Sequence, residues 1–173
     1  MFTKHVLRIF KVALIITLSI LAIRFFIVEP GTVNGRSMEP TFFDNEFFLV
    51  NKLSILVRDP KRGEIAQLHS PLSEKVVIKR IAGLPGEIVS IRSNKVFITT
   101  VDGKEFELEE PYTYPETVTD TPDGGAATYG PLRDHEYFVI GDHREESTDS
   151  RDYGPVHRTR IYGTVMKVPF LSR

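Results

Sequence analysis

A serine lies in a constrained turn early in the chain, in the stretch VNGRSMEPTF at Val33–Phe42. The hydroxyl of this residue, Ser37, becomes an effective nucleophile only when a base removes its proton. None of the five histidines lies in a local signature typical of a hydrolase triad, and no closely spaced histidine pair suggests a metal site. We therefore expect neither a metal nor a cofactor, and the search for a base turns to lysine.

Lys79 lies in the apolar stretch VVIKRIAG and is the best candidate base. In a strand, the two-residue period places Lys79 on the same face as Val77 and Ile81. Burial of that face would disfavour the ammonium ion and lower the lysine pKa from about 10.4 toward neutrality. Taken singly, a serine in a turn and a lysine in a strand are ordinary structural residues. A triad that uses His143 with Asp142 or Asp149 is a separate alternative.

Composition excludes several other kinds of site. The chain has 173 residues, no cysteine and a formal net charge of −1. It therefore has no disulfides, thiolate metal sites or cysteine nucleophile. The balanced charge gives no electrostatic footprint for nucleic acid, so we expect no nucleic-acid partner.

The N-terminal part is basic and apolar. The apolar run Val12–Val28 meets the lower limit of about 17 residues for a membrane span. No acid occurs before Glu29, and the basic residues are Lys4, Arg8, Lys11 and Arg24. These features predict a cytoplasmic tail at 1–11, a single transmembrane anchor at 12–28 and an extracytoplasmic domain at 29–173. A cleavable signal peptide and a buried core helix are the alternatives, but no small-x-small cleavage pattern follows the apolar run.

The rest of the chain has the texture of a β-protein, with short apolar runs between turn residues. We expect strands at Glu46–Leu53, Gly63–His69, Lys75–Gly83, Glu87–Ser93, Lys95–Val101, Lys104–Glu110, Glu136–Asp142 and Gly163–Phe170. Ser93–Lys95 and the Asp102-Gly103 pair mark hairpin turns. The polar segment Tyr114–Pro131 is expected to be a moving loop. The predicted fold is mainly β: one N-terminal transmembrane helix, an antiparallel β-sheet catalytic domain and a smaller β insertion at 88–136.

Four segments together resemble the successive boxes of the type I signal peptidases, the serine/lysine-dyad peptidases of family S26. They occur in that family's order after the N-terminal apolar run, and residues 88–136 are the part that they leave uncovered. The boxes are GRSMEPT at 35–41, RGEIAQLHSP at 62–71, VIKRIAGLPGE at 77–87 and YFVIGDHREESTDSRDYGPV at 137–156.

The resemblance implies a role for each matching residue. Ser37 matches the nucleophile, with its backbone N–H as an oxyanion donor, and Lys79 matches the general base. Ser147 matches the serine that orients this lysine, and Met38 is expected to help wall the pocket for the residue before the cut. The supporting residues are Asp149 and Arg151, with Arg80 beside them as an ion-pair partner.

The sequence departs from the commonest family pattern at two places. Gly35 occupies a position where one branch has a serine that donates to the oxyanion, which assigns this chain to the branch with glycine. In the last box, His143, Glu145 and Glu146 stand where Asn, Asp and Asn are usual. These residues add charge beside the expected site, and the make-up of the oxyanion hole is correspondingly open.

The function implied is that of a bacterial membrane-bound serine endopeptidase that removes N-terminal signal peptides after a small residue. Its partners would be secretory precursor proteins and membrane lipid, at the cell membrane. A self-cleaving repressor-type protease shares the Ser/Lys chemistry but carries a DNA-binding module where this chain has an apolar run. The alternative from another class is a membrane-tethered, non-catalytic assembly module that uses the Tyr114–Pro131 loop as its contact surface.

Overall fold

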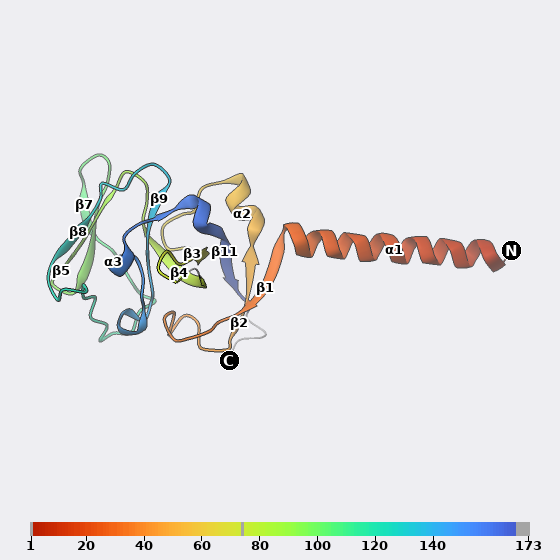
Figure 1. Ribbon diagram of the computed structural model, residues 1–173, viewed down its shortest axis with the longest axis horizontal. Coiled ribbons are helices and arrows are strands. Elements are labelled where there is room, and N and C mark those ends of the chain that lie inside the picture. Colours follow the sequence, from red (N-terminus) through yellow and green to blue (C-terminus); the bar gives the residue numbers. More distant parts are fainter. Residues whose placement is uncertain (1, 74, 169–173) are drawn as a thin grey trace.

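The computed structural model describes residues 2–73 and 75–168. A long helix, α1 (Phe2–Phe26), extends away from a β-rich domain that contains the other elements (Figure 1). Among the described residues, no helix combines the length and the apolar character needed to cross a membrane. The predicted membrane-spanning helix at 12–28 is therefore wrong. Lys11 and Arg24 bracket its apolar run, and Val28 already begins the first strand, so the uninterrupted stretch is shorter than a span requires.

All eight expected strands are present, most of them shorter than the apolar runs that predicted them. Phe170, at the end of the last expected strand, lies outside the described residues. The observed bounds are β2 (Phe47–Asn51), β3 (Ile65–His69), β4 (Val76–Gly83), β5 (Ile88–Arg92), β6 (Lys95–Thr99), β7 (Glu105–Glu107), β9 (Glu136–Ile140) and β11 (Ile161–Lys167).

Several short elements were not expected. The strands are β1 (Val28–Thr32), β8 (Ala127–Tyr129) and β10 (Val156–His157). The helices are α2 (Lys52–Val57), α3 (Ser150–Tyr153) and the single 3-10 turns η1 (Arg144–Glu146) and η2 (Arg158–Arg160). Each is too short to show a sustained period in the sequence, so its formation depends on tertiary contacts.

The strands form two antiparallel sheets. The larger sheet has the order β1-β2-β11-β3-β4-β9-β10, and the smaller has the order β7-β6-β5-β8. The β5–β6 hairpin turns at Ser93 and Asn94, which both have positive φ, and the turn before β7 has Gly103 at φ 81°. Both turns lie where the sequence predicted them.

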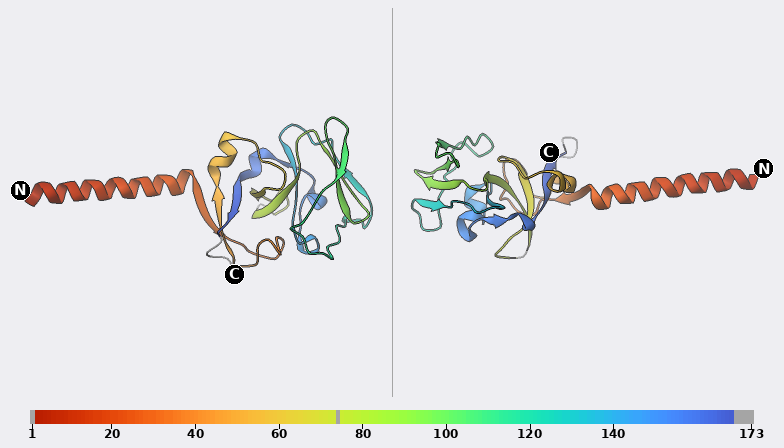
Figure 2. Two further views of the ribbon diagram at one scale, coloured as in Figure 1. Left: turned by 180° about the vertical axis from the view of Figure 1, so that it is seen from behind. Right: turned by 90° about the horizontal axis from the view of Figure 1, so that it is seen from above.

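The smaller sheet lies at the end of the domain remote from α1 and packs on the larger sheet (Figures 1 and 2). The two sheets share a core in which Phe138 and Ile140 of β9 contact apolar residues of the smaller sheet. The smaller sheet contributes Val89, Ile91, Val96 and Ile98, all at most 1% exposed. The inserted segment is thus fixed to β9, the strand that begins the last family-like box.

Candidate active site

Ser37 lies in a turn that is anchored to the core by buried apolar residues. Met38 and Phe42, at 0% and 1% exposure, pack in a core with residues of β2, β3 and β4. Within the turn, the Glu39 N–H donates to the Arg36 carbonyl at 3.0 Å, and the Phe42 N–H donates to the Met38 carbonyl at 2.8 Å. The backbone at Ser37 is therefore held in place although no regular helix or strand contains it.

Gly35 has a backbone conformation that explains its identity. Its φ is +99°, in the region that L side chains rarely adopt, and its N–H donates to the Asp44 carboxylate at 2.8 Å. A serine at this position would be strained in the present turn. A side chain at position 35 that donates to the oxyanion is therefore incompatible with this backbone. The oxyanion donors closest to Ser37 in the sequence are then main-chain N–H groups.

Lys79 is buried in the middle of β4, with 3% exposure. Its Nζ donates to the Ser147 hydroxyl at 3.0 Å. Burial lowers the pKa of Lys79 to about 8, against the opposing attraction of Asp149. A substantial fraction of this amine is therefore neutral near physiological pH, which is the state that a general base requires.

The Ser147 hydroxyl has a fixed direction. It donates to the Asp149 carboxylate at 2.7 Å, so toward Lys79 it can only accept. Asp149 is fully buried and also accepts hydrogen bonds from the Arg151 side chain, the nearest at 2.9 Å. Because the Lys79 amine uses one N–H to donate to Ser147, the lone pair of the neutral amine remains available to another group.

Gly141 is the point where the segments of Ser37 and Ser147 meet. A Cβ added to Gly141 would lie 2.2 Å from the Ser147 Oγ and 2.6 Å from the Ser37 carbonyl oxygen. The Gly141 N–H donates to the same Asp149 carboxylate, at 2.9 Å. The residues that follow Gly141 also contact the serine turn, because the His143 N–H donates to the Ser37 carbonyl at 3.1 Å. The structure thus brings the Ser37 turn, Ser147 and Asp149 together around one glycine.

Arg80 does not pair with Asp149 as the sequence suggested. Its guanidinium binds both carboxylate oxygens of Asp142, at 2.7 and 2.6 Å. Thr41 of the serine turn also donates to Asp142, at 2.5 Å. The antiparallel pairing of Arg80 with Ile140 explains this choice, because it places Arg80 beside the residues that directly follow β9. Arg80 therefore links β4 to the serine turn through Asp142.

His143 is not arranged as a triad base. Its Nδ1 lies 3.9 Å from the Glu39 carboxylate, whereas Asp142 and Asp149 are bound to arginines. The Nδ1 atom is buried and has no hydrogen-bond partner among the described residues. The geometry therefore does not support the alternative that combined His143 with Asp142 or Asp149.

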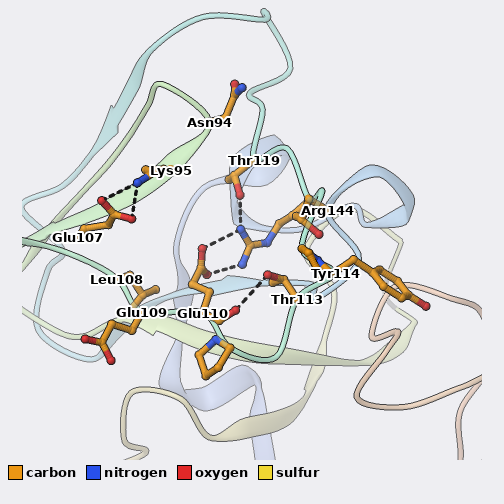
Figure 3. Close-up of a pocket in the computed structure, with 13 residues that line it drawn as sticks. Asn94, Lys95, Glu107, Leu108, Glu109, Glu110, Thr113, Tyr114, Thr119 and Arg144 are labelled. Atoms are coloured by element: carbon orange, nitrogen blue, oxygen red, sulfur yellow. Dashed lines mark hydrogen bonds and ion pairs between the residues drawn. The ribbon is translucent and has the colours of Figure 1, made fainter.

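Arg144 is a buried residue that was not among the site residues predicted from the sequence. It is 2% exposed, and its Nε donates to the Gly141 carbonyl at 2.9 Å. Its outer nitrogens bind Glu110 and Thr119 of the inserted segment, as Figure 3 shows. These residues border a cavity of about 450 Å³ between the smaller sheet and the loop that follows it. The only signal in the sequence was the position of Arg144 inside the last box.

The first half of the Tyr114–Pro131 segment is also tied to the last box. Thr119 is 3% exposed and binds Arg144, and the Asp120 carbonyl accepts a hydrogen bond from Arg151 at 3.1 Å. Arg151 additionally donates to the Arg144 carbonyl at 2.7 Å. Two buried arginines therefore fasten a segment that the sequence presented as a moving loop.

A groove of about 240 Å³ runs from Ser37 along the sheet. It is lined by Glu29–Asn34, Ser37, Phe48, Gln67 and Val76–Ile78. β9 pairs with β4 only from Arg80 onward, so Val76–Ile78 have no strand partner on that side among the described residues. Met38 lies beneath the groove, in the core that it shares with Val33 and Phe48. An extended peptide could pair with this free backbone edge.

Comparison with known proteins identifies a single family. The model described as signal peptidase, peptidase S26, matches residues 6–170. Signal peptidase I of Bacillus amyloliquefaciens is 36% identical over 159 residues, which cover 89% of this chain and 82% of the relative. Signal peptidase I T of Bacillus subtilis strain 168 is also 36% identical over 159 residues, which cover 89% of this chain and 80% of the relative.

Among solved structures, a signal peptidase I from Enterococcus faecalis V583 is 27% identical. The match covers 62% of this chain and 97% of that chain, with a TM-score of 0.48. The family match over nearly the whole sequence and the two Bacillus relatives agree with one another. The chain therefore belongs to the signal peptidase family, peptidase S26, and is a serine endopeptidase of the signal peptidase I type.

Proposed function

We propose that this enzyme removes N-terminal signal peptides from secretory precursor proteins, with Ser37 as nucleophile and Lys79 as general base. The observation that carries the proposal is the buried Lys79 amine, whose pKa is lowered to about 8 and whose orientation is set by Ser147. A buried lysine with a lowered pKa beside a serine turn is the arrangement that Ser/Lys hydrolysis requires.

The reaction proceeds through an acyl-enzyme. Neutral Lys79 accepts the Ser37 proton as the Ser37 oxygen attacks the carbonyl carbon of the scissile peptide bond. The backbone N–H of Ser37 is a donor to the oxyanion that develops, and a single such donor contributes roughly 3–4 kcal/mol to transition-state stabilisation. The Lys79 ammonium then protonates the leaving amine, which breaks the C–N bond. Water activated by the same amine releases the acyl group and restores the Ser37 hydroxyl.

The groove beside Ser37 is the proposed substrate site. The free backbone edge at Val76–Ile78 can hold an extended segment by main-chain hydrogen bonds, as in strand addition. Alternate side chains of the segment then point into the groove, where the limited space favours small residues before the cut. Met38 supports the floor through its contacts with groove residues.

We place the reaction at a lipid surface. The described side chains of α1 are exposed, and they include large apolar residues such as Leu7, Phe10, Ile15 and Leu18, which are 56–66% exposed. Apolar surface of this extent associates with lipid rather than water. Tethering through α1, with the β domain on the side where signal peptides emerge, would hold Ser37 near its substrates.

The test is direct cleavage of a secretory precursor by the purified full chain, with the cut bond mapped by mass spectrometry. We expect one cut after a small residue, complete loss of cleavage in Ser37→Ala and Lys79→Ala, and retention of the folded β domain in both. Substantial turnover by either variant would reject the dyad. A serine-directed covalent probe that labels wild type but not Ser37→Ala would exclude the non-catalytic assembly module.

A further inference from the structure

His143 is a partly buried residue that takes no part in the proposed reaction. Its side chain is 15% exposed, and its Nδ1 atom has no hydrogen-bond partner among the described residues. A buried polar atom left without a partner costs about 1–3 kcal/mol. The position of this atom beside the serine turn indicates that it has a function there.

A charged group of the serine turn lies close to His143. Glu39, whose side chain is 10% exposed, has its Oε2 atom 3.9 Å from the His143 Nδ1. The same oxygen accepts a hydrogen bond from the Arg36 side chain at 3.3 Å. Arg36 and Glu39 lie on either side of Ser37 in the sequence, so a change in the position of Glu39 acts on the backbone that carries the nucleophile.

The inserted segment reaches the same histidine. The Tyr114 ring lies edge-on to the His143 ring, with 5.6 Å between centroids and an interplanar angle of 74°. A small cavity of about 120 Å³ lies between the two residues. The groups around His143 are thus Glu39 and Arg36 from the serine turn, Tyr114 and Glu116 from the inserted segment, and Arg144, Glu145 and Glu146 from its own segment.

We propose that His143 is a positioning residue for Ser37, which acts by donating an Nδ1–H hydrogen bond to Glu39. This inference rests on the proposed function of Ser37. With the proton on Nδ1, its N–H donates to Glu39, and the separation closes from 3.9 Å toward the roughly 2.8 Å of a charge-assisted hydrogen bond.

The closed contact gives His143 a second bond to the serine turn. Its side chain then holds the Glu39 carboxylate together with Arg36, while its backbone N–H donates to the Ser37 carbonyl. With both contacts in place, the backbone that carries the Ser37 hydroxyl is held in position for attack on the scissile carbonyl carbon.

The test compares kcat and KM for a short peptide substrate at a single pH. The variants are His143→Gln, Glu39→Gln and the double variant, with His5→Gln as the control for a histidine exposed on α1. We expect kcat of His143→Gln to be about tenfold below wild type, with KM unchanged. Glu39→Gln should behave alike, the double variant should be no worse than either, and His5→Gln should follow wild type.

Each other result contradicts the proposal in its own way. Wild-type kcat in His143→Gln would show that its side chain does not position Ser37. Effects of the two substitutions that multiply would show that His143 and Glu39 act separately. Complete loss of activity in His143→Gln would make His143 a catalytic residue instead. The proposed function fails separately, if Ser37→Ala retains turnover, whereas an inactive Ser37→Ala with wild-type kcat in His143→Gln rejects only the role of His143.

Discussion

At the scale of single residues, the chemistry depends on the charge of Lys79. Its amine is neutral above a pKa of about 8 and charged below it. Since only the neutral amine accepts the Ser37 proton, kcat/KM should rise with pH and level off above about pH 8. Lys79→Arg should abolish the activity across this range, because a guanidinium stays protonated. A wild-type profile that is flat from pH 6 to 9 would contradict the assignment of Lys79.

The same residue should make the fold less stable than it could be. A folded-state pKa of about 8 against an ordinary lysine pKa of 10.5 corresponds to a penalty of roughly 3 kcal/mol on the charged amine. The penalty is complete below about pH 8 and disappears as the pH rises to the unfolded value. Lys79→Met should therefore raise the free energy of unfolding at pH 6 by up to roughly 3 kcal/mol, less the lost bond to Ser147.

Denaturant unfolding of Lys79→Met and wild type at pH 6 and pH 10 provides the measurement. The gain should be smaller at pH 10, where Lys79 is nearly neutral in the folded state and most of the penalty has disappeared. An equal gain at the two pH values would mean that burial of charge is not the cause. Val77→Met, on the same strand but partly exposed, is a control for the added methionine.

At the scale of elements, the segment after β9 requires a residue without a side chain at 141. A Cβ there would overlap the Ser147 hydroxyl and the Ser37 carbonyl. Gly141→Ala should displace both groups, and a misplacement of about 1 Å can lower kcat by about a hundredfold. Gly125→Ala, where a Cβ meets nothing within 4 Å, is the matched control and should be fully active. Wild-type kcat in Gly141→Ala would contradict the crowded geometry.

The buried pair between Arg144 and Glu110 fastens the inserted segment to this same region. Glu110→Gln leaves the Arg144 guanidinium buried without its counter-charge, which typically costs about 3–5 kcal/mol. For a chain of this size, such a loss lowers Tm by roughly 6–20 °C. Glu107→Gln removes an exposed pair with Lys95 and should change Tm far less. Thermal unfolding of the two variants makes the comparison, and equal shifts would argue against the buried pair.

The contacts between elements also show which parts of the site could be predicted from the sequence. Alternation placed Lys79 on an apolar strand, whereas Ser147 and Asp149 were predicted from the resemblance of their segment to the last family box. Arg80 was paired with the wrong carboxylate because its partner depends on the register of β4 against β9. Arg144 and Glu110 are 34 residues apart, and only the path of the inserted loop brings them together. Long-range register and loop paths carry no local signal.

At the scale of the whole molecule, α1 and the β domain contribute differently to catalysis. The proposed active site lies in the β domain, whereas the exposed apolar side chains of α1 lie outside it. Deleting residues 2–26 should therefore reduce cleavage of precursors embedded in lipid vesicles at least tenfold more than cleavage of a short peptide in solution, because tethering raises the local concentration of substrate. Parallel assays with both substrates make the measurement. An equal loss on both would instead point to damage within the β domain.

The unpaired edge of Val76–Ile78 has a consequence for the range of proteins that one such enzyme can serve. Main-chain amides are the same in every polypeptide, so an edge that reads them ignores most of the side-chain sequence. Such an edge instead requires a particular backbone conformation, because the region around the cut must be able to become extended. A precursor whose helix continues through the cleavage point would have to unwind there before it could be cut, and sequence changes that stiffen this helix would slow maturation without altering the residue at the cut.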